Sequence, residues 1–107
     1  MIELKKQFTK KGTDFNQIYK DNDVVIYKLT RNNADGDGMY IWFEVFKRKV
    51  KPQDIYHEEE FEKYPSDEAF GNWAWSCSNV ECVKKVLNNY FKECEHTSKI
   101  IKLLNRM

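Results

Sequence analysis

The sequence is poor in the features by which a protein's compartment and chemistry are often recognised. It has three cysteines, two prolines and four glycines in 107 residues, and its formal net charge is only +1. An odd and small number of cysteines is typical of free thiols in a reducing compartment. A charge near zero argues against a strongly basic nucleic-acid-binding domain. We therefore expect neither a disulfide-stapled scaffold nor a protein held on nucleic acid by charge alone.

Long apolar runs are also missing. The N-terminal residues MIELKKQFTKK contain no apolar centre of a signal peptide, and no run approaches the roughly eighteen apolar residues of a membrane helix. None of the common nucleotide-binding or hydrolase motifs occurs, whether a P-loop, GxGxxG, GxSxG or HExxH. We expect a cytoplasmic protein without a membrane segment or cofactor, and one that is not an enzyme.

Aromatic and charged residues are plentiful. They make up 15% and 33% of the chain, which gives a short chain enough large side chains for one core and predicts a single domain over residues 1–107. The charges are segregated, because residues 52–70 carry seven acidic side chains against Lys63 alone. This acidic segment is typical of a solvated loop and is a second, weaker candidate for a binding surface.

Several segments have the pattern of β-strands. Residues 2–8 alternate as an edge strand does, and a hairpin is predicted on either side of the turn at 21–23. Residues 39–50 are apolar on both faces for half their length, which is typical of a central strand covered on each side. Residues 72–76 alternate again as a short strand, with Trp73 and Trp75 on the same face.

The C-terminal third is predicted to be helical. Ser78 and Glu81 have the spacing of a capping box, and apolar residues recur behind them with helical periodicity. Residues 97–105 are helical again, either as a continuation or after a break near 96–98. The expected fold is α+β: an antiparallel sheet of four to five strands with one long C-terminal helix, unbroken or in two pieces, packed on one face.

Cysteine and histidine residues are candidates for a zinc site or a nucleophile. The residues concerned are Cys77, Cys82, Cys94 and His96. Their spacing does not fit a zinc ribbon or finger, and Cys82 and Cys94 on one helix would lie roughly 18 Å apart. Cys77 would need a neighbouring base to act as a nucleophile, and the pattern brings neither His57 nor His96 to it. We therefore predict no metal site and an unreactive Cys77.

One strand face carries the candidate binding site. Tyr40, Trp42 and Phe46 project from the same face of the predicted central strand and lead into Arg48. Trp, Tyr and Arg are enriched at protein-interface hot spots, whereas aromatic residues beside basic ones also suit single-stranded nucleic acid. A third interpretation is that Trp73, Trp75 or the loop over 51–63 folds over this face and buries it.

A family resemblance suggests a setting. The block YPSDEAFG at 64–71, followed by WAW at 73–75 and preceded by the strand EVFKRKV, resembles small uncharacterised proteins of bacteriophages and prophages. The resemblance covers about residues 15–90 and transfers no catalytic residue. It implies a small accessory protein that acts in a bacterial cytoplasm, often by binding.

The functional expectation follows from the aromatic face and from this resemblance. We expect a non-enzymatic accessory protein that binds a host or phage protein, with inhibition of a host defence system as one role. The alternative is single-stranded nucleic-acid binding through the same aromatic and basic face. The sequence does not indicate an oligomeric state.

Overall fold

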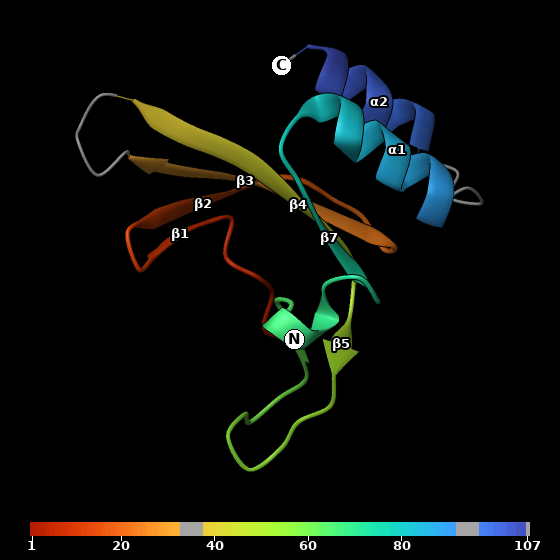
Figure 1. Cartoon of the computed structure of the whole chain (residues 1–107). Helices are drawn as coiled ribbons and strands as arrows, with labels where there is room; N and C mark the ends of the chain where they lie inside the picture. The colour runs from red at the N-terminus through yellow and green to blue at the C-terminus, as the bar shows by residue number, and fades with distance from the viewer. Residues whose placement is uncertain (33–37, 92–96, 107) are drawn as a thin grey trace.

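The computed structural model describes residues 1–32, 38–91 and 97–106, and one five-stranded antiparallel sheet dominates it (Figure 1). The spatial order of the strands is β1-β2-β3-β4-β7. These strands are β1 Gln7–Lys10, β2 Thr13–Lys20, β3 Val24–Asn32, β4 Met39–Lys47 and β7 Ala74–Cys77. A short ribbon of β5 Val50–Lys51 and β6 Phe61–Glu62, a 3₁₀ turn at Asp67–Ala69, and the helices α1 Val80–Tyr90 and α2 Thr97–Asn105 complete the described elements. The α+β class predicted from the sequence is confirmed.

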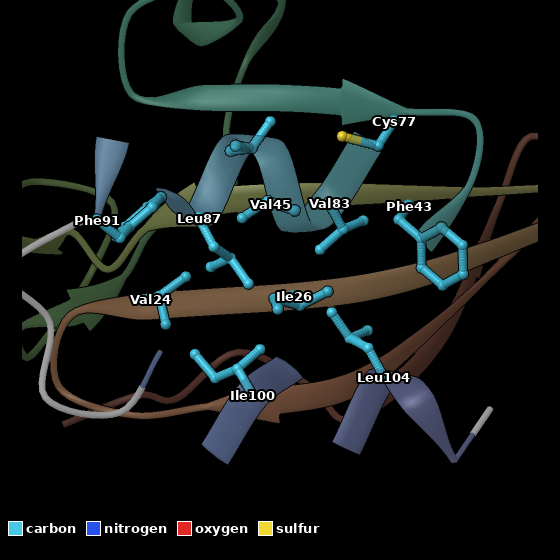
Figure 2. Close-up of a cluster of buried hydrophobic side chains, with 11 residues drawn as sticks. Val24, Ile26, Phe43, Val45, Cys77, Val83, Leu87, Phe91, Ile100 and Leu104 are labelled. Carbon is cyan, nitrogen blue, oxygen red and sulfur yellow. The ribbon is translucent and has the colours of Figure 1, made fainter. Parts of the chain in front are cut away.

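Both helices cover the same face of the sheet (Figures 1 and 2). Alternate residues of β3 and β4 point toward the helices, while α1 and α2 direct their apolar stripes back at them. The buried residues of this layer include Val24, Ile26, Phe43, Val45, Val83, Leu87, Ile100 and Leu104. The helical pair therefore buries one of the two apolar faces of β4.

An aromatic layer covers the other face. Val25, Tyr27, Leu29 and Phe46 are buried there, and Tyr64 and Trp73 from the segment between β6 and β7 pack on them. β4 also lies between β3 and β7 in the sheet. This confirms the prediction that the strand is central and covered on both sides, although it ends at Lys47 rather than at residue 50.

Two tight turns fix the register of the first three strands. Lys11 and Gly12 join β1 to β2 with positive φ angles of 51° and 78°, a turn whose twist matches that of the strands. Between β2 and β3, one carboxylate oxygen of Asp21 accepts hydrogen bonds from the N–H groups of Asp23 and Val24. The predicted hairpin is therefore confirmed.

The first strand begins later than the sequence pattern indicates. The pattern predicts a strand over residues 2–8, but β1 starts at Gln7. Ile2 instead forms a bridge with Phe61, and the Leu4 N–H donates to the side chain of Glu62 at 2.9 Å. The prediction is wrong here because Glu62 draws the first residues toward β6 and away from β2.

The first turn of α1 also differs from the prediction. Asn79, not Ser78, is the N-cap, and its side-chain oxygen accepts a hydrogen bond of 2.8 Å from the Cys82 N–H. The capping box of Ser78 and Glu81 is therefore wrong by one residue. The helix begins at Val80 because the amide side chain of Asn79 satisfies a backbone donor of the first turn.

This cap can be tested directly. Asn79→Ala should lower the free energy of unfolding by about 1 kcal/mol, the usual cost of removing an N-cap side chain. Ser78→Ala is the matched control and should change it by less than about 0.5 kcal/mol, as exposed substitutions do. Urea denaturation followed by circular dichroism measures both. If Ser78→Ala lowered the free energy of unfolding more than Asn79→Ala does, Ser78 rather than Asn79 would be the N-cap.

Candidate functional site

Phe46, one of the four predicted site residues, lies in the core. Its side chain has no exposed surface. Its ring centroid lies 5.0 Å from that of Tyr64, 6.0 Å from that of Tyr27 and 6.2 Å from that of Trp73. The expectation that Phe46 contributes to an exposed binding face is therefore wrong, because the segment leading into β7 folds over it.

Only one of the two tryptophans near β7 takes part in this covering. Trp73 packs in the aromatic layer, but Trp75 faces the helices and stacks on Tyr90, with ring centroids 4.2 Å apart. The prediction that both lie on one face is wrong. β7 begins at Ala74, and Trp73 belongs to the preceding turn, where its N–H donates to the Ala69 carbonyl, so strand alternation does not reach it.

Arg48 is held by a buried carboxylate. Its guanidinium donates to Glu62, whose side chain is fully buried, and Lys20 donates to the other carboxylate oxygen at 2.9 Å. Burial alone would raise the pKa of Glu62, but the hydrogen bonds from Lys20, the Leu4 N–H and Arg48 outweigh it and lower that pKa. Arg48 is thus a structural cation, and Glu62 is not part of an acidic surface.

Tyr40 and Trp42, the other two predicted residues, lie together at the outer end of β4. Tyr40 is 59% exposed, while Trp42 is partly buried against the aromatic layer. An open hollow of about 850 Å³ lies beside them. Its lining residues are Gly12, Arg31, Asn32, Tyr40, Ile41, Trp42 and Ser78.

Arg31 supplies the cation of this hollow. It stands opposite Tyr40 in the register of β3 and β4, and its guanidinium donates to the Lys11 carbonyl at 3.1 Å. No pattern in the sequence indicates Arg31 as a site residue, because its position beside Tyr40 depends on the hairpin register. Once the ends of both strands are known, that register places the two side chains on one face.

Among the described residues, no strand pairs with the β7 side of β4 at the same place. β7 pairs with β4 only from Phe43 to Phe46, so Met39, Tyr40 and Ile41 extend past the last residue of β7. Met39 is 58% exposed and Ile41 is 46% exposed. Together with Tyr40 and the partly buried Trp42 they form a continuous apolar stretch. We call this stretch, residues 39–42, the outer end of β4.

Glu44 lies farther along the aromatic face. The Tyr64 hydroxyl donates to its carboxylate at 2.6 Å, and the Trp42 side chain is a further hydrogen-bond partner. Burial raises the pKa of Glu44 above its ordinary value despite these bonds. Burial and the adjacent Glu44 carboxylate likewise raise the pKa of Tyr64. Glu44 therefore anchors Tyr64 over the sheet.

The cysteine and histidine candidates do not form a site in the described residues. Cys77 and Cys82 carry free thiols, and burial together with the neighbouring Cys82 raises the pKa of Cys77 to about 12. The imidazole of His57 forms a hydrogen bond with the Asp54 carboxylate and stacks on the ring of Phe61. Cys94 and His96 lie outside the described residues. Among the residues that the structure describes, no group of His, Cys, Asp or Glu is placed to hold a metal ion.

The acidic segment (residues 52–70) contains an exposed turn near its beginning. Asp54 and His57 exchange backbone hydrogen bonds around Ile55 and Tyr56, which are 89% and 84% exposed. Figure 1 shows this segment extending away from the sheet beyond β5. Ile55 and Tyr56 are therefore exposed apolar residues that lie apart from the outer end of β4.

No protein-family model, curated protein or solved structure matches the chain. No helix in the described part of the chain is long and apolar enough to cross a membrane.

Proposed function

We propose that the protein is a non-enzymatic interaction module whose protein partner binds at the outer end of β4. The observation that carries this proposal is the exposure of Met39, Tyr40 and Ile41 beside the hollow that contains Trp42 and Arg31. Exposed apolar residues in a contiguous patch mark interaction sites on soluble proteins. Tyr, Trp and Arg are also the residue types that contribute most binding energy at protein interfaces.

The described geometry favours a protein over single-stranded nucleic acid as the partner. Stacking on a nucleic-acid platform requires exposed rings and phosphate contacts require free cations. Phe46 is buried, and Arg48 is engaged by Glu62. Arg31 is the single cationic side chain among the described residues that line the hollow. A surface with one cation suits an interface anchor better than a phosphate track.

The biological setting that we propose rests on the resemblance of the block at 64–75. It is that of a small accessory protein of a bacteriophage or prophage, which acts in the bacterial cytoplasm on a host or phage protein. A component of a host defence system is one partner of this kind.

Substitution of Tyr40 tests the proposed surface. Tyr40→Ser should remove partner binding and change the free energy of unfolding by less than about 0.5 kcal/mol, because the side chain is mostly exposed. Tyr56→Ser is the matched control, since it removes an equally large and more exposed tyrosine that lies apart from the outer end of β4. Tagged wild-type protein and both variants are used for affinity capture from a bacterial lysate, with and without nuclease.

The expected result is a protein that wild type and Tyr56→Ser retain, that Tyr40→Ser loses, and that nuclease leaves bound. If only Tyr56→Ser lost the partner, the binding site would instead lie at the turn between Asp54 and His57. Capture abolished by nuclease, and weakened steeply from low to physiological salt, would instead support the nucleic-acid alternative.

A further inference from the structure

Within the part of the chain that the structure describes, backbone groups at the outer end of β4 have no neighbouring strand on the β7 side. The Lys47 N–H donates to the Trp73 carbonyl at 2.9 Å, which shows that Lys47 directs its backbone groups toward the β7 side. Direction alternates along an antiparallel strand, so Val45 and Phe43 also face β7, and Ile41 and Met39 face the same side. β7 has ended at Cys77, opposite Phe43. Within the described residues, the N–H and C=O groups of Met39 and Ile41 therefore point to an open edge.

The edge of the sheet at β1 and the end of β4 that β7 does not reach differ in chemistry. The edge beyond β1 carries Lys10 within the strand and Lys5, Lys6 and Lys11 next to it. Lysines at an edge discourage another strand from pairing there. The outer end of β4 carries Met39, Tyr40, Ile41 and Trp42 instead. The protection found at β1 is thus missing where β4 is unpaired.

We propose that a second copy of this chain pairs with this edge, so that two sheets join through antiparallel outer ends of β4. A twofold axis at Tyr40 places Met39 opposite Ile41 of the second copy and Tyr40 opposite its own equivalent. In this register the edge-facing groups of Met39 and Ile41 form two hydrogen-bonded residue pairs. The interface is isologous, with the same residues contributed by both copies.

The edge is self-complementary in polarity and charge. Each apolar side chain meets an apolar one, and no like charges stand opposite each other in the register. Gly38 falls opposite Trp42 of the second copy, where the pairing must end because Cys77 of that copy already occupies the place beside Phe43. A Cβ at Gly38 would meet no atom within 4 Å, so Gly38 itself is not crowded. The net charge of +1 adds little repulsion between copies.

The pairing goes beyond the proposed function, although both involve the outer end of β4. It uses the strand edge, whereas Arg31 and Trp42 lie on the face of the sheet that carries the aromatic layer. Two joined sheets would bring two such hollows side by side on one continuous face. A partner could then bind the dimer at two equivalent places.

Three exposed residues per copy make a small interface, below the roughly 1,200 Å² of a standard stable complex, so the dimer should be weak. Sedimentation equilibrium of the purified full chain from about 10 µM to 1 mM covers the affinity range expected of such a contact. The weight-average mass should rise from one chain toward two with concentration. Ile41→Lys should keep it at one chain throughout, because it adds a charge to the pairing edge.

Ile55→Lys is the matched control, because it places the same charge on an exposed isoleucine outside the edge and should leave the mass increase unchanged. Ile41→Pro gives an independent check, since it removes an edge-facing N–H and leaves the hydrogen bonds to β3 intact. It should also keep the weight-average mass at one chain. Circular dichroism shows that each variant is folded.

Hydrogen exchange then locates the contact. The amides of Met39 and Ile41 should exchange more slowly as concentration rises, while those of Tyr40 and Trp42, which face β3, should be slow at every concentration. A mass of one chain at all concentrations overturns the proposal. So does a dimer that persists in Ile41→Lys, or one in which the Met39 and Ile41 amides keep the same exchange rate. If the wild-type protein stays monomeric at every concentration while Tyr40→Ser no longer captures the partner protein, the pairing is excluded and the proposed function is supported.

Discussion

Phe46→Ala is expected to lower the free energy of unfolding by about 3–5 kcal/mol, the range for truncating a buried aromatic side chain. The substitution removes a ring that contacts Tyr27, Tyr64 and Trp73 and has no exposed surface. Because small domains have only about 5–15 kcal/mol of stability, this is a large share of the total. Urea denaturation monitored by tryptophan fluorescence measures the loss.

Tyr40→Ser serves as the comparison, because Tyr40 projects from the same face of β4 but is mostly exposed. The two substitutions should therefore differ strongly in stability although the sequence placed both residues in one site. If Phe46→Ala instead left the free energy of unfolding within about 0.5 kcal/mol of wild type, as surface substitutions do, the aromatic layer would not cover β4.

Glu62→Gln is expected to lower the free energy of unfolding at pH 7 by about 3 kcal/mol, the lower end of the range for breaking a buried ion pair. The carboxylate is fully buried and accepts bonds from Lys20, Arg48 and the Leu4 N–H. The low end applies because the Lys20 and Arg48 side chains remain about one-fifth exposed and can be partly hydrated. Urea denaturation of wild type and variant gives the difference.

The pH dependence of this difference has a defined sign. The pKa of Glu62 in the folded state is lowered from its ordinary value of 4.5. Its ionisation therefore stabilises the fold fully above that value, and the contribution is lost as the pH falls through the folded pKa. The gap between wild type and Glu62→Gln should be constant from pH 7 to about pH 5 and should narrow below about pH 4.5. A gap that widened toward acid pH would contradict the lowered pKa.

Glu44→Gln is the control for charge removal, because the pKa of Glu44 is raised by burial. A raised folded pKa means that the stabilising contribution is present at low pH and is lost as the pH rises through the folded pKa. The variant should therefore be at least as stable as wild type at pH 7, since the glutamine oxygen can still accept the Tyr64 hydrogen bond. Replacement by glutamine should therefore lower the free energy of unfolding at Glu62 but not at Glu44.

Much of the fold follows from local pattern. The two apolar faces of residues 39–50 predict a central strand, and the helical periodicity that follows Ser78 and Glu81 predicts a layer on one face. The turn residues at 21–23 predict the hairpin that sets the register of β2 and β3. These features depend on neighbours in the sequence, which is why the sequence is sufficient for them.

The site depends on contacts between distant residues, and there the sequence was insufficient. The burial of Phe46 requires Tyr64 and Trp73 to return to β4, and the role of Arg48 requires Glu62 to be buried between it and Lys20. Neither contact has a signature in spacing. The exposed end at Tyr40 arises because β7 is only four residues long, and the alternation around Trp73 and Trp75 predicted a different start for that strand.

Site-specific photo-crosslinking tests the assignment of the binding surface most directly. Benzoylphenylalanine replaces Tyr40 in one version of the protein and Tyr56 in another, and both are irradiated in a bacterial lysate. We expect position 40 to form a covalent adduct with a protein and position 56 to form none. Mass spectrometry of the adduct distinguishes its two sources: an adduct of two chains of this protein would mark the edge pairing, and an adduct with a different protein would mark the partner. Adducts from position 56 with none from position 40 would contradict a binding surface at the outer end of β4.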